Sequence, residues 1–260
     1  MPELPEVEVA ARFLQGHIAG RTLRAVSWLH PSLQRDADAS VPSLIGCRVQ
    51  SVARVAKWQE VRFTDGAVMV VHFRMTGDWA VTNTAEPPRH ARAHFEFSEA
   101  CHVWLVDPRV LARVHVRVAG DDLPRQPVGP DALDPLLDAA ALRGRFAARR
   151  APIKQVLLDQ SVIAGVGNIY AAEALWHARI HPAAPARQLS LARVGRLLAG
   201  IRWTMGLALD ENGRHQYGGA TDRLCVYDRE GQPCRRCGSR IARITQGQRS
   251  TYWCQRCQRS

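Results

Sequence analysis

The chain ends in the stretch CRRCGSRIARITQGQRSTYWCQRCQRS, residues 234–260. It holds two Cys-x-x-Cys pairs, Cys234 with Cys237 and Cys254 with Cys257, separated by 16 residues. Two such thiolate pairs match the four-sulfur structural zinc pattern, in which each pair supplies two ligands and the intervening chain forms a ribbon. The stretch also has seven arginines and no acidic residue. The tail therefore predicts a zinc-folded hairpin that contacts phosphate.

Composition and charge favour a globular protein with a polyanionic partner. With 260 residues, 46% of them hydrophobic, the chain is long enough for two domains with their own cores. Its start, MPELPEVEVAARFL, has acidic residues and no long apolar run, so we expect no secretory signal, no membrane anchor and a reducing cytoplasm. Disulfides in the tail would need an oxidising compartment. The net charge of +11 makes nucleic acid the first candidate partner.

Lysine and the remaining cysteines are few enough to be informative. Of the 35 basic residues 33 are arginine, and the exceptions are Lys57 and Lys154. Two isolated lysines indicate positions that suit a compact point charge better than a planar guanidinium, with compositional drift as the alternative. Cys47, Cys101 and Cys225 lie in apolar stretches, and we expect buried free thiols rather than reactive ones.

The first 118 residues have mainly strand patterns after one helix. We expect that helix from Pro5 to Gly16, where glycine stops it. The Asp65-Gly66 pair is a hairpin signal between two strands. Seven short strands with hardly a helix between them predict an antiparallel sandwich or barrel. The β-rich runs are residues 22–29, 48–55, 60–64, 67–73, 93–98, 102–106 and 112–118.

The second half has helical spacing. Apolar residues recur with a period of 3.6 in residues 136–148, 153–159, 168–178 and 189–209. Proline-rich residues 119–135 read as a linker, and polar, glycine-rich residues 211–224 as a mobile loop. We therefore expect a sandwich domain at 1–118, a linker at 119–135, a helical domain at 136–225 and a zinc finger at 226–260.

A glycine turn separates the second and third of these helices. In SVIAGVGN, residues 161–168, Gly165 and Gly167 allow a tight turn with exposed main-chain N–H groups, and Asn168 can cap the helix that follows. Such a turn at a helix N-terminus is a natural phosphate site, although glycine turns between helices usually serve packing.

Four segments occur together in the order found in one known family. They are MPELPEVEVA at 1–10, IKQVLLDQSVIAGVGNIYAAEALWHARIHP at 153–182, VYDREGQPCRRCG at 226–238 and GQRSTYWCQRCQ at 247–258. The chain thereby resembles the bacterial formamidopyrimidine-DNA glycosylases, of the group that includes endonuclease VIII. The resemblance implies an α+β fold: an N-terminal antiparallel β-sandwich with an N-terminal helix, a helix-two-turn-helix domain and a four-cysteine zinc-finger β-hairpin.

The resemblance implies catalysis by Pro2, whose secondary amine is freed when Met1 is removed. An α-amine has a pKa close enough to neutrality to be partly unprotonated in the cell. Its attack on C1′ of a damaged nucleoside would expel the base, form an iminium and lead to β,δ-elimination. Glu3 would protonate the sugar ring oxygen. Glu6 supports this end of the helix, and Lys57, on a sandwich strand, would hold a phosphate beside the damaged nucleotide.

Further residues match the family's DNA contacts. Asn168 would grip the flanking backbone, Lys154 would line the site, and Arg249 at the tip of the finger hairpin would clamp a phosphate. In the same helical motif Glu173 is a buried hydrogen-bonding partner or a second carboxylate of the site, and we favour the structural role. A flipped base leaves a gap in the duplex. Three residues fill it in the family, here Met75, Arg109 and, in place of the usual aromatic residue, Leu111.

The first functional hypothesis is therefore a bifunctional DNA glycosylase and abasic-site lyase of base-excision repair, acting on oxidised purines such as formamidopyrimidines and 8-oxoguanine. It would hold one structural Zn²⁺, act on damaged double-stranded DNA as a monomer and have no contact with membranes. An endonuclease VIII-like preference for oxidised pyrimidines is the alternative that Leu111 and the loop at 211–224 keep open. A non-catalytic zinc-finger protein that binds damaged DNA is the third, and the intact set of Pro2, Glu3 and Lys57 argues against it.

Overall fold

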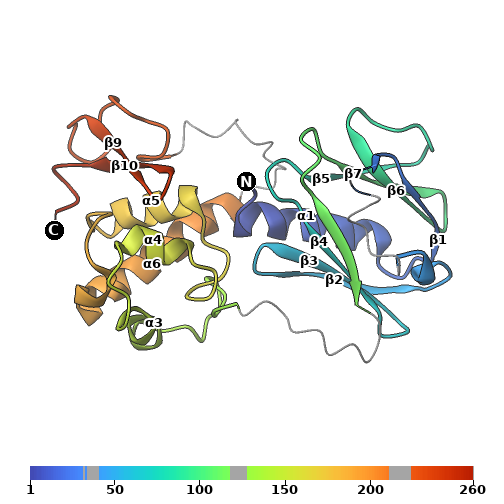
Figure 1. The fold of residues 1–260 in the computed structure, drawn as a ribbon, viewed down its shortest axis with the longest axis horizontal. Coiled ribbons are helices and arrows are strands. Elements are labelled where there is room, and N and C mark those ends of the chain that lie inside the picture. Colours follow the sequence, from blue (N-terminus) through green and yellow to red (C-terminus); the bar gives the residue numbers. More distant parts are fainter. Residues whose placement is uncertain (32, 34–40, 118–127, 211–223, 260) are drawn as a thin grey trace. The chain divides into compact units, whose positions relative to one another are not determined.

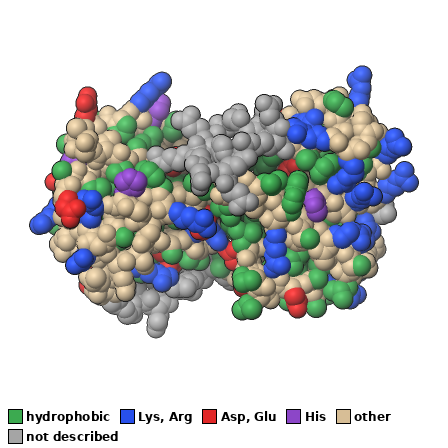
Figure 2. Space-filling model, turned by 180° about the vertical axis from the view of Figure 1, so that it is seen from behind, with side chains coloured by type: hydrophobic (Ala, Val, Ile, Leu, Met, Phe, Trp, Pro, Cys, Tyr) green, Lys and Arg blue, Asp and Glu red, His purple; other side chains and the backbone are tan. Residues whose placement is uncertain are grey.

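The computed structural model describes residues 1–31, 33, 41–117, 128–210 and 224–259. The chain forms two compact units, Met1–Pro124 and Arg125–Ser260. Together their elements confirm the predicted mixed α+β fold. No helix within the described ranges has the length and apolar character needed to cross a membrane. Figure 2 shows one face with many Lys and Arg side chains and few Asp and Glu, in line with the net charge.

The first unit consists of a helix and two four-stranded antiparallel sheets (Figure 1). One sheet has the order β1-β6-β7-β5 and the other β2-β3-β4-β8. The elements are α1 (Leu4–Ile18), β1 (Leu23–Trp28), the 3-10 helix η1 (Val41–Leu44), β2 (Val49–Val55), β3 (Trp58–Phe63), β4 (Val68–His72), β5 (Asp78–Thr82), β6 (Ala91–Phe97), β7 (Cys101–Val106) and β8 (Arg113–Arg117).

A single apolar core lies between the two sheets and α1. Phe63 and Met69 enter it from one sheet, Phe95 from the other, and Leu14 from the helix. Trp79 is buried edge-on against Phe95 at 6.0 Å, and its indole N–H donates to Gln59 Oε1 at 2.7 Å. Two separate sheets that share a core form a sandwich, which decides between the sandwich and the barrel.

Two elements of this unit differ from the sequence-based prediction. Helix α1 continues past Gly16 to Ile18, because burying Ile18 contributes about 2 kcal/mol, more than the roughly 1 kcal/mol that a helical glycine costs. Strand β5 was not predicted, since its sequence DWAVT starts with a poor strand former; pairing with β7 and the burial of Trp79 create it. The hairpin at Asp65-Gly66 is confirmed, with Gly66 at φ 87° between β3 and β4.

The second unit contains four α-helices and a two-stranded hairpin in its described part. Helix α5 packs against α6 on one side and against β10 of the hairpin on the other (Figure 1). The elements are α3 (Ala139–Phe146), α4 (Ile153–Leu158), α5 (Asn168–His177), the 3-10 helix η2 (Ala186–Gln188), α6 (Leu191–Asp210), β9 (Ile241–Gln246) and β10 (Arg249–Cys254).

The predicted linker and mobile loop fall largely outside the described residues. Of the loop at 211–224, only Leu224 is described, and of the linker only residues 128–135. These last residues belong to the second unit and pack against the segment after α4: Gly129 N donates to Gln160 O at 2.7 Å, and a Cβ on Gly129 would lie 2.6 Å from the carbonyl carbon of Val162. The three boundaries between the four predicted segments stay predictions.

Candidate functional site

The four cysteines of the tail come together. Their sulfur atoms all lie within 4.8 Å of one another, with 4.0 Å between Cys234 and Cys257 and 3.5 Å between Cys237 and Cys254. Around a tetrahedral zinc ion with Zn–S bonds of about 2.3 Å, sulfurs lie about 3.8 Å apart. Among the described residues this is the one His, Cys, Asp and Glu group with the geometry of a metal site. The donor set fits one zinc ion.

Hydrogen-bond donors surround these sulfurs. The main-chain N–H of Arg236 and the indole N–H of Trp176 both point at Cys234 Sγ, at 3.5 and 3.4 Å. N–H donors stabilise a thiolate relative to a thiol and orient it as a ligand. Trp176 belongs to α5, so the metal centre is joined to the helical part of the unit.

The predicted hairpin between the cysteine pairs is present. Strands β9 and β10 pair antiparallel, and Arg249 faces Gln246 across a two-residue turn. Both turn residues, Gly247 and Gln248, have positive φ, 53° and 61°, as a type I′ turn requires. Arg249 is therefore exposed at the tip, as a phosphate clamp must be.

Two side chains from the helices hold the residue that follows Arg249. Lys154, only 1% exposed on α4, donates from Nζ to Ser250 O at 2.9 Å and to Thr251 Oγ1 at 2.6 Å. Asn168 at the start of α5 donates from Nδ2 to the same Ser250 O at 3.2 Å. The structure thus brings together three residues far apart in sequence. Their contacts with DNA stay predictions.

The glycine turn before α5 differs from expectation. Gly165 has φ 95° as a tight turn needs, but its N–H donates to Gln160 Oε1 at 3.0 Å and is not free for phosphate. Gly167 is the N-cap residue, and Asn168 is the first residue of the helix rather than its cap. The N–H of Gly165 is occupied because the Gln160 side chain folds back over the turn, where it also donates to Val166 O at 2.9 Å.

Glu173 has the structural role that we favoured. It is buried on α5, and its carboxylate accepts the main-chain N–H groups of Cys225, Val226 and Tyr227 at 2.7, 2.9 and 2.8 Å. Burial raises its pKa, while these three donors oppose the shift. The carboxylate therefore fixes the chain that enters the zinc finger.

The three cysteines outside the zinc finger, which were predicted to be free thiols, have raised pKa values. Cys101 and Cys225 are buried as predicted, and burial raises the pKa of Cys225 to about 12. Cys47 is only half-buried, because it follows the exposed turn after η1; its Sγ lies 3.2 Å from Asp65 Oδ2, and burial and that carboxylate raise its pKa. None of these thiols has the low pKa of a reactive cysteine.

In the first unit the amino terminus lies in a charged, partly desolvated setting. Pro2 and Glu3 are buried, and Glu3 forms a capping box with Glu6, whose Oε2 accepts from Glu3 N at 2.8 Å. Burial lowers the pKa of the terminal amino group. Lys57 and Arg109 lower it further, while Glu3 and Glu6 oppose them. Four charged side chains thus act on the amine.

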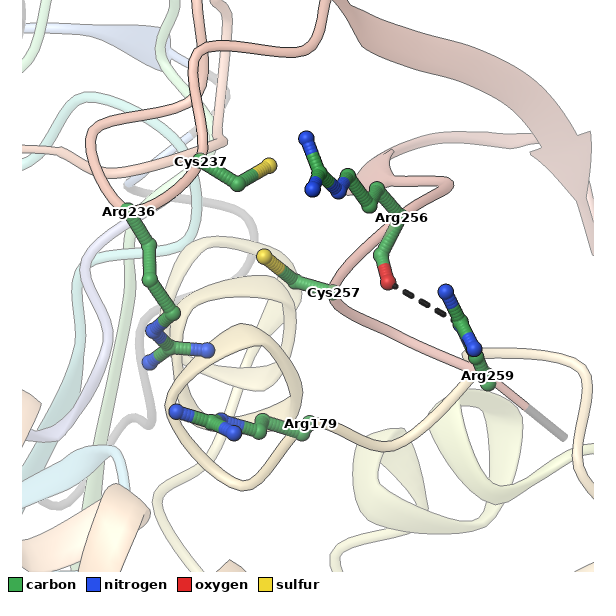
Figure 3. A pocket seen from close by; sticks show the side chains of 6 residues that line it. All are labelled: Arg179, Arg236, Cys237, Arg256, Cys257 and Arg259. Carbon is green, nitrogen blue, oxygen red and sulfur yellow. Dashed lines mark hydrogen bonds between the residues drawn. The ribbon is translucent and has the colours of Figure 1, made fainter.

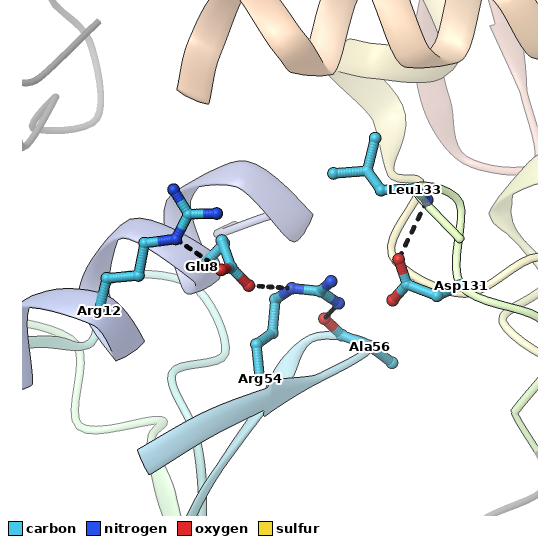
Figure 4. Close-up of polar contacts among 6 residues, drawn as sticks. All are labelled: Glu8, Arg12, Arg54, Ala56, Asp131 and Leu133. Atoms are coloured by element: carbon cyan, nitrogen blue, oxygen red, sulfur yellow. Dashed lines mark hydrogen bonds and ion pairs between the residues drawn. The ribbon is translucent and has the colours of Figure 1, made fainter. Parts of the chain in front are cut away.

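Lys57 lies in the turn between β2 and β3, not on a strand as predicted. Ala56 just before it has φ 55°, so the chain reverses there. Arg54 supports this turn: Figure 4 shows its guanidinium between Glu8 of α1, at 2.8 Å, and Ala56 O, at 3.0 Å. The ion pair ties α1, which begins two residues after Pro2, to the turn that carries Lys57. Sequence reasoning missed Arg54, since nothing in a strand pattern indicates a partner 46 residues away.

The three candidate gap-filling residues lie on two loops. Met75, 37% exposed, is in the loop between β4 and β5. Arg109, exposed, and Leu111, half-buried, are in the loop between β7 and β8. A wedge that enters DNA must project from its domain, and Met75 and Arg109 do so.

One buried carboxylate, which the sequence analysis missed, organises both loops. Asp107 is 0% exposed and accepts the main-chain N–H groups of Arg109, Leu111 and Ala112 at 3.1, 2.6 and 2.8 Å. It also accepts the hydroxyl of Thr76, next to Met75 on the other loop. An aspartate at the start of a loop is a signal for such a turn, because its carboxylate readily accepts the main-chain N–H groups of the residues that follow.

Family models match three consecutive parts of the chain. The formamidopyrimidine-DNA glycosylase N-terminal domain matches residues 1–114, and the H2TH domain of the same family matches residues 128–217. A zinc finger found in FPG and IleRS matches residues 231–259.

Whole-length relatives agree with these models. The formamidopyrimidine-DNA glycosylase of Acidothermus cellulolyticus is 38% identical over 276 residues, covering 99% of this chain and 97% of the relative. The crystal structure of the MutM (FPG) protein from Thermus thermophilus has a TM-score of 0.87 at 33% identity, covering 99% and 98%. A complex of the Lactococcus lactis protein with DNA containing FAPY-dG has a TM-score of 0.89 at 27% identity, covering 99% and 100%.

Proposed function

Because this chain belongs to the formamidopyrimidine-DNA glycosylase family, we propose that it is a bifunctional DNA glycosylase and abasic-site lyase that excises oxidised purines. The observation that carries the proposal is the amino terminus: Pro2 is buried, and burial is the largest effect on the pKa of the adjoining Met1 amino group, which it lowers. A nucleophilic amine must be unprotonated, and the same burial would favour that form for the Pro2 amine once Met1 is removed.

The reaction would begin when removal of Met1 frees the amine of Pro2. The nitrogen forms a bond to C1′ of the damaged nucleoside as the bond from C1′ to the base breaks. Glu3 gives a proton to the ring oxygen as the sugar opens, and the nitrogen gives its own proton to the departing base, which leaves an iminium. Loss of the 2′ proton then expels the 3′ phosphate, and a second elimination expels the 5′ phosphate. Pro2 and Glu3 are adjacent and buried, which suits this transfer.

Basic and amide side chains would position the DNA backbone. We assign a phosphate beside the damaged nucleotide to Lys57 and flanking phosphates to Asn168 and Arg249. Lys154 would act in part through the hairpin, since its ammonium already holds Ser250 and Thr251. Met75, Arg109 and Leu111 would fill the gap left by the flipped base.

One structural zinc ion would be bound by Cys234, Cys237, Cys254 and Cys257, and its contribution is to fold the finger that carries Arg249. The partner would be damaged double-stranded DNA, bound by a monomer in the cytoplasm. Solved complexes of similar proteins contain abasic or FAPY-dG DNA, which supports this partner.

Borohydride trapping tests the chemistry. Incubation with abasic-site duplex and borohydride should give a covalent adduct that peptide mass spectrometry places on Pro2, and a Pro2→Gly variant should show a changed trapping rate while Arg24→Gln, on the exposed surface, should not. A protein that lacks Met1 and still forms no adduct would show that the lyase assignment is wrong.

A lesion panel tests the substrate. We expect faster excision of formamidopyrimidine and 8-oxoguanine than of oxidised pyrimidines when each is placed opposite every base. Leu111, where the family usually has an aromatic residue, keeps the endonuclease VIII-like alternative open, and faster excision of oxidised pyrimidines would establish it.

A further inference from the structure

A pocket lined by arginines lies beside the zinc cysteines. Its volume is about 600 Å³. Figure 3 shows the guanidinium groups of Arg179 and Arg236 pointing toward each other, with the sulfur of Cys257 nearby. The lining residues are Arg179, Arg236, Cys237, Arg256, Cys257 and Arg259.

The four arginines that line the pocket come from three segments. Arg179 follows α5, Arg236 lies inside the first cysteine pair, and Arg256 and Arg259 lie within and after the second. The pocket is at the far end of β10 from Arg249, about 17 Å along a six-residue strand. It is therefore distinct from the hairpin tip assigned to DNA.

Two of these arginines are held in place by the protein. Arg236 lies 4.1 Å above the ring of Trp176 and donates to Trp176 O at 3.0 Å. Arg259 donates from Nε to Arg256 O at 3.3 Å. Side chains ordered in advance lose less entropy when a ligand binds.

Arg179 has a main-chain conformation that normally favours glycine. Its φ is 58°, and it occupies the C′ position of a Schellman motif, in which Arg179 N donates to Trp176 O at 3.2 Å and Ile180 N to Leu175 O at 3.0 Å. A residue with a side chain costs free energy at such a position, which binding by the Arg179 guanidinium would offset.

The pocket has an excess of positive charge. None of the four guanidinium groups is paired with a carboxylate in the part of the chain that the structure describes. A zinc ion with four thiolates carries a net charge of about −2, which four arginines more than offset, leaving about +2. Balancing the metal centre alone therefore does not explain the cluster.

We propose that this pocket binds phosphate groups. Guanidinium groups bind phosphate oxygens through paired N–H donors, and several of them can share one phosphate or pyrophosphate. The group could be a free anion or a phosphodiester of DNA beyond the segment contacted by the hairpin tip. Binding of a free anion does not depend on the proposed repair function, whereas binding of a DNA phosphodiester rests on it.

Pyrophosphate is the probe for the site. Its binding to the zinc-loaded protein would be measured by calorimetry for the wild type and for the triple variant Arg179→Gly, Arg256→Gln and Arg259→Gln. Glycine suits the left-handed position, and Arg236 is left in place because it stacks on α5, so the variant should fold. A triple variant of the exposed residues Arg24→Gln, Arg143→Gln and Arg196→Gln removes the same charge elsewhere.

The proposal predicts at least tenfold weaker pyrophosphate binding in the pocket variant and little change in the control. Anisotropy with a short and a long duplex then separates the two sources. A DNA phosphate in the pocket weakens binding of the long duplex alone, whereas a free-anion site leaves both affinities unchanged. Equal binding of pyrophosphate by pocket and control variants, with equal affinities for both duplexes, overturns the proposal. Borohydride trapping by the same variants reports separately on the repair chemistry.

Discussion

Lys154 Nζ donates to the main-chain oxygen of Ser250 across 2.9 Å, which joins α4 to the residue next to the hairpin tip. An ammonium that is 1% exposed has lost its hydration, so it must be satisfied by protein acceptors, here Ser250 O and Thr251 Oγ1. The orientation of Arg249 is thereby set by a residue 96 positions before its neighbour Ser250.

Lys154→Met should loosen the hairpin. The change removes both hydrogen bonds to β10, and we expect the free energy of unfolding to fall by about 2 kcal/mol. Urea denaturation measures the loss, and hydrogen exchange of the β10 amides shows where it arises. Unchanged stability with weakened DNA binding would instead mean that Lys154 acts on phosphate directly.

The pH dependence of trapping should respond to the charges around the amine. Only the neutral amine reacts, so trapping rises with pH through the pKa, and a lowered pKa extends the reaction to lower pH. Lys57 lowers the pKa of the Met1 amino group and Glu6 raises it, and we expect the same signs for the Pro2 amine that replaces it. The midpoint should therefore move to higher pH in Lys57→Gln and to lower pH in Glu6→Gln, which keeps the capping box.

Trapping rates at saturating abasic DNA, measured across pH, give this midpoint independently of binding strength. The opposite signs of the two shifts are the internal control. Shifts in the same direction in both variants would show that the charges do not act on the amine.

Much of the fold could be predicted from the sequence because local residue patterns determine it. The β-rich run at residues 102–106 and the Asp65-Gly66 turn gave a strand and a hairpin without reference to the rest of the chain. Strand β5 was not readable, because its pairing with β7 and the burial of Trp79 decide it. The extension of α1 to Ile18 likewise depends on the core that Ile18 enters.

The candidate site likewise has residues that the sequence could identify and residues that only the folded chain reveals. The spacing of the four cysteines predicted that they would come together, and they do. Pro2 and Glu3 were assigned from a family resemblance, and their catalytic role stays a prediction. Arg54 was not identified from the sequence, because its ion pair with Glu8 spans 46 residues. Asp107 was not either: the hydroxyl it accepts belongs to a residue 31 positions earlier, and only the folded chain shows that one carboxylate serves two loops.

Loss of zinc should abolish tight DNA binding while the sandwich stays folded. Cys254→Ser removes one of four ligands, and structural zinc sites contribute about 10 kcal/mol or more to folding of the finger. We expect at least roughly tenfold weaker binding, since Arg249 loses its support. Anisotropy measures affinity, and a colorimetric chelator measures zinc. Cys47→Ser is the matched control, and unchanged affinity without zinc would contradict the role of the finger.

Asp107→Asn should disorganise both gap-filling loops. The amide turns donors toward the N–H groups of Leu111 and Ala112, so we expect a loss of about 3 kcal/mol in the free energy of unfolding. Thr76→Val removes only the link between the loops and should cost about 1 kcal/mol. Both should slow excision from duplex DNA.

Trapping on single-stranded abasic DNA needs no gap to be filled, so it should persist in both variants. If single-stranded trapping falls as far as duplex excision, Asp107 affects the fold in general rather than the positions of Met75 and Arg109.

Leu111→Phe should strengthen the wedge. Leu111 is half-buried at the base of a loop whose main chain Asp107 fixes, so a larger ring can extend outward without disturbing the N–H to carboxylate bond. An aromatic ring stacks on a base, which contributes about 1–3 kcal/mol per base, whereas leucine offers only apolar contact. We therefore expect faster excision and altered discrimination among the four opposite bases, with single-stranded trapping unchanged. Leu111→Met, similar in volume and without a ring, is the control. Equal opposite-base profiles for the Phe and Met variants would show that this position does not stack on the duplex.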